Sequence, residues 1–161
     1  MPRFRLLTPS ELQELEPEFK QFLIINQVYD KEWRDLAAND PQKAQEFIAL
    51  FSDIVLEKTY QKAAGLVQIG QDFIALFSLQ EEKWQLLQFK FENGQLPKEL
   101  ELNGLFGYLK THWNHAQLTR GSKPTPNNKP EIVHQMVQNG AQILGPTFGQ
   151  QLHELFDLLG A

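Results

Sequence analysis

The side chains best able to do chemistry in this sequence are its four histidines, all of which lie in the C-terminal half. His112 and His115 are three residues apart, a spacing that places them on one face of a helix. Glu131 and His134 share that spacing, and such pairs supply ligands in helical metal sites. One hypothesis is therefore a metal-dependent enzyme that uses His112, His115, Glu131 and His134.

That hypothesis requires at least three ligands that converge and leave a position open for water. His153, with Glu154 and Asp157, could complete such a shell, but the spacing by itself does not establish convergence. The sequence has no cysteine and lacks the zincin motif, the phosphate-binding loop, the dinucleotide fingerprint and the nucleophile elbow. The sequence therefore predicts no catalytic residue and no cofactor, and a non-enzymatic role becomes the leading hypothesis.

The elements that would position these side chains follow from length and hydrophobic periodicity. A chain of 161 residues suits one compact domain, and 42% hydrophobic residues suffice for a core. We predict a single domain over residues 1–161. It consists of a core over 1–118, a Pro-rich loop over 119–130 and C-terminal helices over 131–161.

The first third of the sequence has the pattern of helices. Thr8 and Glu11 form a capping box around Pro9, and Pro17 predicts a kink or a restart of the helix that follows. A second helix is predicted to begin at Asp30. The longest is predicted over residues 41–64, with an inward stripe of Ala44, Phe47, Ile48, Phe51, Ile54 and Val55.

In the middle of the chain the hydrophobic period changes from about 3.6 residues to 2. This predicts three short strands over residues 66–69, 73–79 and 84–91, joined by tight turns into an antiparallel meander. The second strand is apolar on both faces, so it needs a helix layer or a second subunit on each side. The predicted fold class is α+β: N-terminal helices, a three-stranded antiparallel β-meander and C-terminal helices.

The last third combines a helix over residues 102–113 with the Pro-rich loop and two further helical segments. The loop carries Arg120, Lys123 and Lys129, which could meet an acidic partner or a phosphate, although a solvated loop is the preferred interpretation. The final segment is apolar on one side. We name it as a candidate interaction surface, although docking on its own core is the commoner arrangement for such a terminus; its residues are Phe148, Leu152, Leu155, Phe156 and Leu159.

Charge and hydropathy exclude several classes of function. The net charge of −5 disfavours a nucleic-acid binder, which needs a basic face. Apolar runs such as Phe22–Ile25 are far shorter than the ~20 residues that span a bilayer. No signal-peptide pattern opens the sequence. We therefore predict a cytoplasmic protein that contacts neither nucleic acid nor membrane.

Part of the sequence resembles a known family. The segments TPSELQELEPEF (residues 8–19) and NDPQKAQEFIALFSDIVLEK (residues 39–58), with Trp33 between them, are similar to an uncharacterised family of small cytosolic proteins from Bacteroidota. The resemblance covers about the first 90 residues and implies two or three helices that lead into a small sheet. The family has no assigned activity, so the leading hypothesis remains a protein-interaction or adaptor domain that binds itself or another protein.

Overall fold

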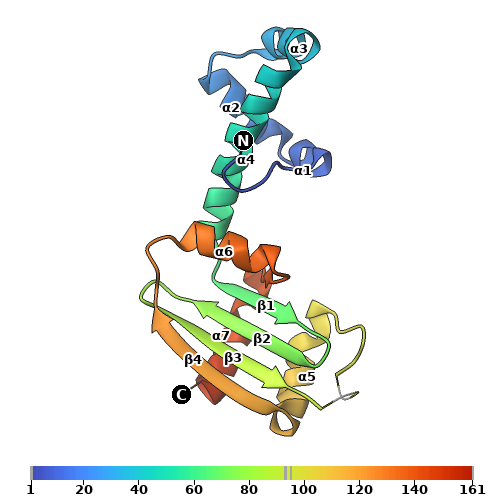
Figure 1. The fold of residues 1–161 in the computed structure, drawn as a ribbon, viewed down its shortest axis with the longest axis vertical. Helices are drawn as coiled ribbons and strands as arrows, with labels where there is room; N and C mark the ends of the chain where they lie inside the picture. The colour runs from blue at the N-terminus through green and yellow to red at the C-terminus, as the bar shows by residue number, and fades with distance from the viewer. Residues whose placement is uncertain (1, 93, 95, 161) are drawn as a thin grey trace. The chain divides into compact units, whose positions relative to one another are not determined.

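The computed structural model describes residues 2–92, 94 and 96–160 (Figure 1). The sequence predicts one domain over residues 1–161, and within this range the structure distinguishes two compact units. Unit 1 is Met1–Gln61 and unit 2 is Lys62–Ala161.

Unit 1 is helical, as the sequence predicts. It contains α1 (Pro9–Glu14), α2 (Glu16–Ile25), α3 (Asp30–Asn39) and α4 (Pro41–Lys62), whose last residue belongs to unit 2. The capping box is confirmed, because the Glu11 N–H donates to Thr8 Oγ1 at 3.1 Å and the Thr8 N–H donates to Glu11 Oε1 at 2.9 Å. The restart near Pro17 is confirmed as well, since α1 ends at Glu14 and α2 begins at Glu16.

An aromatic cluster forms the core of unit 1. The Phe51 ring on α4 lies 5.0 Å from Phe19 and 5.4 Å from Phe22, both on α2. Trp33 on α3 meets Phe19 edge to face at 5.2 Å. Aromatic pairs at these separations stabilise beyond the area that they bury, so this cluster holds α2 and α3 against α4.

Backbone N–H groups of the segment before α1 donate hydrogen bonds to side chains of α4 and hold the segment along that helix. The N–H groups of Arg3 and Phe4 donate to the Asp53 carboxylate at 2.8 and 3.1 Å, and the buried Leu7 N–H donates to Ser52 Oγ at 3.0 Å. Further along, the guanidinium of Arg5 donates to both carboxylate oxygens of Glu11. That bidentate pair and the Thr8 N–H lower the pKa of Glu11 from 4.5 to about 2.

Unit 2 is built on a five-stranded antiparallel sheet with the strand order β4-β3-β2-β1-β5. The prediction of a three-stranded meander is therefore wrong in strand number. The predicted strands correspond to β1 (Gly65–Ile69), β2 (Phe73–Leu79) and β3 (Lys83–Lys90), while the two edge strands are β4 (Gln117–Pro124) and β5 (Gln142–Ile143).

The prediction of a Pro-rich loop over residues 119–130 is also wrong for the first half of that range. These residues continue β4, which pairs with β3 along its whole length, from Lys83↔Pro124 to Lys90↔Gln117. An edge strand pairs through its backbone alone, and every side chain of β4 except that of Leu118 is exposed. Its sequence therefore carries no alternation of apolar and polar residues from which a strand could be predicted.

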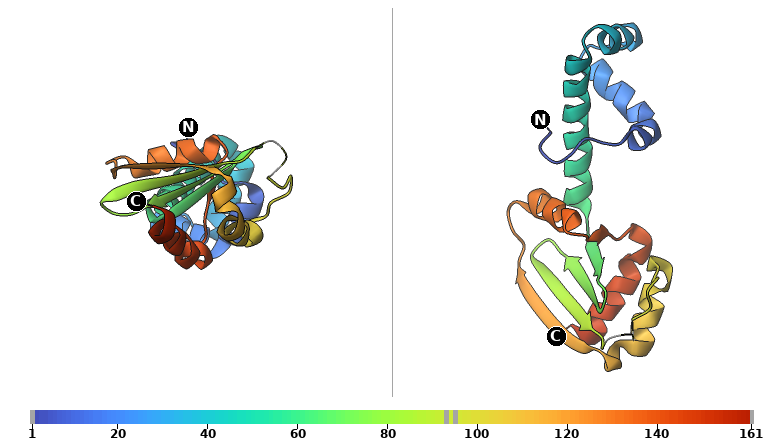
Figure 2. Two further views of the ribbon diagram at one scale, coloured as in Figure 1. Left: turned by 90° about the horizontal axis from the view of Figure 1, so that it is seen from below. Right: turned by 45° about the vertical axis from the view of Figure 1, so that its right-hand side comes forward.

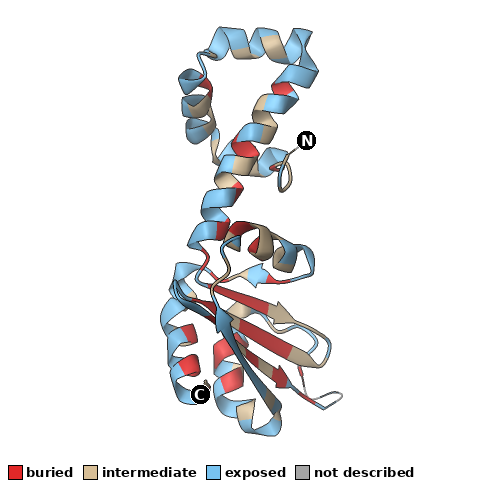
Figure 3. Cartoon of the chain, turned by 60° about the vertical axis from the view of Figure 1, so that its left-hand side comes forward, coloured by how far each residue is buried: buried red, intermediate tan, exposed pale blue. Residues whose placement is uncertain are grey.

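Helices of unit 2 cover both faces of this sheet (Figures 1 and 2). On one face lie α5 (Leu102–His112) and α7 (Gly149–Leu159), and on the other lies α6 (Lys129–Gln138). The requirement that β2 be covered on both sides is thus met within this chain. Burial follows β1, β2 and β3 and the sheet-facing sides of the helices (Figure 3). The main core includes Ile74, Leu76, Leu87, Phe89, Leu105, Leu109, Leu152 and Leu155.

The Arg5–Glu11 pair makes the stability of unit 1 depend on pH. We expect Glu11→Gln to lower the free energy of unfolding at pH 7 by about 1 kcal/mol, a small value because the pair is about one third exposed and solvent screens it. Because the pKa of Glu11 is lowered in the folded state, its ionised carboxylate stabilises that state fully above the ordinary pKa of 4.5. This stabilisation is lost as the pH falls to about 2, so the difference in unfolding free energy between wild type and variant should vanish over that interval.

Urea unfolding of both proteins at several pH values, followed by circular dichroism, measures this difference. Glu14→Gln is the matched control, since Glu14 is exposed on the same helix and makes no ion pair with a described residue. A difference between wild type and Glu11→Gln that stays constant from pH 7 to pH 2 would contradict the role of the ionised carboxylate.

The packing of α7 provides a second prediction. Leu155 is 1% exposed in the core and Leu158 on the same helix is 67% exposed. We expect Leu155→Ala to lower the free energy of unfolding by about 2–5 kcal/mol because it leaves a cavity, whereas Leu158→Ala should stay within about 0.5 kcal/mol of wild type. Urea unfolding of the two variants tests this, and equal effects would mean that α7 does not pack as described.

Candidate functional site

The sheet separates the two halves of the predicted metal site. His112 ends α5 and His115 lies in the following 3-10 turn η1 (Trp113–His115), while Glu131 and His134 lie on α6, across the sheet from α5. The two rings of the first pair are 6.3 Å apart between centroids. Over residues 2–92, 94 and 96–160, no three His, Cys, Asp or Glu side chains are grouped to hold a metal ion. The four predicted ligands are therefore not brought together.

The histidines on α5 and α7 have local partners. The His112 ring stacks on Tyr108 at 4.2 Å between centroids and 14° between planes. Its Nδ1 lies 2.7 Å from Thr111 Oγ1 and 3.0 Å from the Tyr108 carbonyl oxygen. His153 faces Asp157 one turn along α7, with 3.2 Å between Nε2 and Oδ2, and both side chains are exposed. These contacts are those of histidines that belong to helix surfaces.

The candidate interaction residues of the C-terminal segment contribute to the core of unit 2. Leu152, Leu155, Phe156 and Leu159 are all buried in it. Phe148, which ends the 3-10 turn η2 (Pro146–Phe148), packs against that core and stacks on Phe106 at 5.9 Å. The structure thus has the arrangement in which the terminal helix docks on its own unit, and binding of another chain by these residues stays a prediction.

The three basic residues assigned to the loop occupy three different environments. Arg120 on β4 donates through Nε to the Leu159 carbonyl oxygen at the C-terminal end of α7. Lys123, further along β4, places its Nζ 5.3 Å from the centroid of the Trp84 ring. Lys129 begins α6, and burial lowers its pKa. No single basic patch results. Arg120 borders a small cavity of about 180 Å³ together with Phe156, and Lys123 borders a larger, mainly apolar one.

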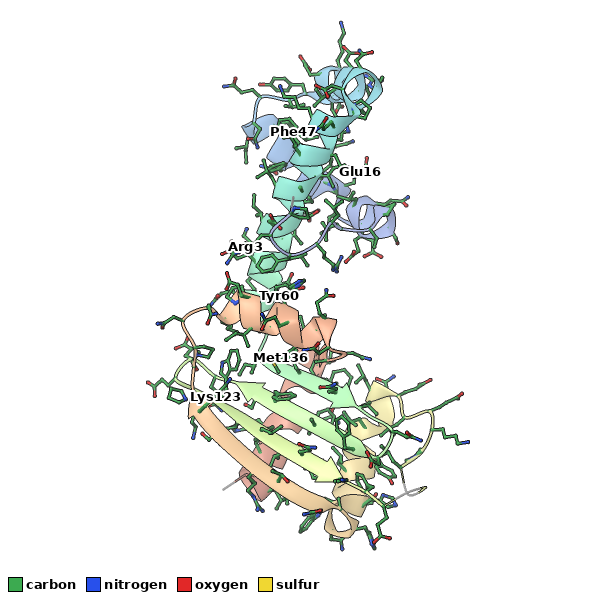
Figure 4. All side chains as sticks on the ribbon, in the orientation of Figure 1. Arg3, Glu16, Phe47, Tyr60, Lys123 and Met136 are labelled. Carbon is green, nitrogen blue, oxygen red and sulfur yellow. The ribbon has the colours of Figure 1, made fainter. Side chains whose placement is uncertain are left out.

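The mainly apolar cavity beside Lys123 has a volume of about 270 Å³. Phe77 and Leu86, a cross-strand pair of β2 and β3, line it together with Trp84. Met136 contributes from α6, and β4 contributes Gly121, Ser122 and Lys123. Figure 4 labels Lys123 on β4 and Met136 on α6, the two elements that border this part of the sheet. Every lining residue belongs to unit 2.

A second cavity, of about 680 Å³, lies at the other end of β3 and is polar. Side chains of both signs line it, among them Asp72, Lys90 and His115. Because these charges oppose one another, the cavity favours neither an anion nor a cation. The apolar cavity is therefore the candidate functional site of unit 2.

The sequence contains part of this site but does not reveal it. The alternation in β2 and β3 places Phe77, Trp84 and Leu86 on one face, as the predicted strands imply. Gly121 and Lys123 join them only because residues 117–124 form a strand, and Met136 joins them only because α6 covers that face. A weak signal was available, since an isolated Gly between Arg120 and Ser122 is compatible with close approach of two strands.

The fold gives the structural class of this chain, and comparison with known proteins gives its family. The fold defines an α+β protein, and its candidate site is a mainly apolar cavity. The chain belongs to a family described as a family of unknown function (DUF6495), which it matches over residues 1–157. The match thus extends well beyond the 90 residues of the resemblance. No curated protein and no solved structure matches the chain.

The structure also bears on membrane association. Among the helices of residues 2–92 and 96–160, none has both the length and the apolar character needed to cross a bilayer.

The contact between Arg120 and the end of α7 yields a stability prediction. A cation that donates to the last carbonyls of a helix stabilises them by hydrogen bonding and through the helix dipole. We expect Arg120→Met, which keeps the aliphatic stem, to lower the free energy of unfolding by about 1–2 kcal/mol. Lys83→Met on the adjacent strand is the control, because Lys83 is exposed and makes no ion pair with a described residue. Equal urea midpoints for wild type and Arg120→Met would show that this contact contributes nothing.

Proposed function

We propose that this protein is a non-enzymatic cytoplasmic protein-interaction module that self-associates through unit 1. One observation carries the proposal: large apolar side chains are exposed on unit 1 at adjacent positions. They are Ile24 at 52%, Ile25 at 75%, Tyr29 at 53%, Leu50 at 56% and Ile54 at 44%. Single exposed apolar residues are common on protein surfaces, whereas adjacent ones are typical of interaction sites.

These residues fall into two groups. Ile24, Ile25 and Tyr29 flank the turn between α2 and α3, where Gln27 has a positive φ of 63°. Leu50 and Ile54 lie one turn apart on α4 and form an apolar stripe on that helix. Ile54 belongs to the stripe predicted to face inward, and its 44% exposure corrects that prediction. Its neighbours Phe51 and Ser52 face the core of unit 1 instead.

A second copy of the chain is the partner that needs the fewest further features. In a two-fold symmetric dimer the same patch serves both subunits, so a stripe that is complementary to itself is sufficient. Two copies of α4, a helix of 22 residues, can pack antiparallel with Leu50 and Ile54 at the centre. The charged and polar residues beside this stripe would form the rim that such interfaces have.

The molar mass in solution tests this proposal. We expect light scattering during size-exclusion chromatography to give a dimer whose fraction rises with concentration. The double substitution Leu50→Glu and Ile54→Glu should give a monomer, because it places charge in the centre of the interface, while circular dichroism should show unchanged helix content.

Leu158→Glu is the matched control, since Leu158 is 67% exposed but lies on α7 in unit 2. This variant should retain the dimer. The proposal fails if the wild type remains a monomer at every accessible concentration, or if the double variant has the same molar mass as the wild type.

A further inference from the structure

The apolar cavity of unit 2 has properties that the proposed self-association does not use. Its floor is formed by Phe77 and Leu86, which are opposite one another on β2 and β3 and remain only half-buried. Large apolar side chains in the middle of a sheet are normally covered completely. Here α6 covers the sheet as far as Met136, and the cavity begins beside that residue.

Gly121 leaves this space open. It pairs with Leu86, and a Cβ added at position 121 would lie 3.5 Å from Leu86 Cβ, an ordinary van der Waals distance. Its φ is outside the left-handed region, so the backbone does not require glycine there. The absence of a side chain at Gly121 therefore leaves room over Leu86, and the fold of β4 does not require a glycine there.

A positively charged side chain borders the cavity. Lys123 makes no ion pair with a described residue, and its Nζ lies over the Trp84 ring. Trp84 is 4% exposed, and its indole Nε1–H finds no acceptor among the described residues. That nitrogen has almost no accessible surface, so a molecule in the cavity would contact the Trp84 ring and not its N–H. No carboxylate lines the cavity.

We propose that this cavity binds a small organic acid with an apolar body. The apolar part lies on Phe77, Leu86 and Met136, and the carboxylate pairs with Lys123. A volume of about 270 Å³ is just below the range of drug-sized pockets, roughly 300–1,000 Å³, which indicates a short acyl or single-ring acid. This site is independent of the self-association of unit 1.

Methionine labelling offers a direct test, because Met136 and Met1 are the only two methionines in the sequence. In protein labelled with [13C-methyl]methionine, we expect titration with octanoate to shift the Met136 methyl resonance saturably. The neutral analogue 1-octanol should bind about tenfold more weakly, and Lys123→Gln should reduce the affinity for octanoate to a similar extent.

Two substitutions on β4 separate cavity binding from general effects. Gly121→Val fills the cavity and should abolish the octanoate shift. Thr119→Val, on the same strand and the same face but outside the lining, should leave it unchanged. The proposal is overturned if octanoate does not shift the Met136 methyl resonance saturably. It is also overturned if wild type binds 1-octanol as tightly as octanoate, or if Lys123→Gln or Gly121→Val binds octanoate as tightly as wild type does.

Discussion

The two apolar faces of β2 are the constraint on which the architecture of unit 2 depends. Ile74 and Leu76 point to one side and Ala75 and Leu79 to the other, and all four are buried. A sheet of this kind is stable only when both sides are covered. The chain meets this requirement in sequence order: α5 lies on the first face, β4 returns to the sheet, α6 lies on the second face, and α7 follows β5 back to the first face.

Close approach of α7 depends on a glycine at the start of β1. A Cβ on Gly65 would lie 2.5 Å from Leu152 Cδ2 and 3.4 Å from Leu144 Cδ1, so a larger residue would require the Leu152 side chain to move. The first face is closely packed at Gly65, while a cavity of about 180 Å³ remains beside Arg120 and Phe156. The second face has one helix for five strands, and cover is incomplete where β3 meets β4. The apolar cavity lies at this gap in the cover of the second face.

The parts of the fold that hydrophobic periodicity determines were predictable from sequence. They include the capping box at Thr8, strands β1 to β3 and the helices that end the chain. Strand β4 was missed because its residues are polar and it pairs only through its backbone with β3, and β5 was missed because it has two residues. The metal-site hypothesis failed for a related reason. The spacing of His112 and His115, or of Glu131 and His134, specifies a helix face but not the side of the sheet on which the helix lies.

The same reasoning explains why the candidate sites lie where no motif drew attention. In unit 2 the side chains that the sequence singles out make structural contacts: Arg120 donates to the end of α7, His112 stacks on Tyr108 and Leu155 packs in the core. The two proposed sites use surface that packing leaves incomplete: the stripe at Leu50 and Ile54 in unit 1, and the floor at Phe77 and Leu86 in unit 2. Because these surfaces belong to separate compact units, a substitution at one proposed site should leave the other unchanged.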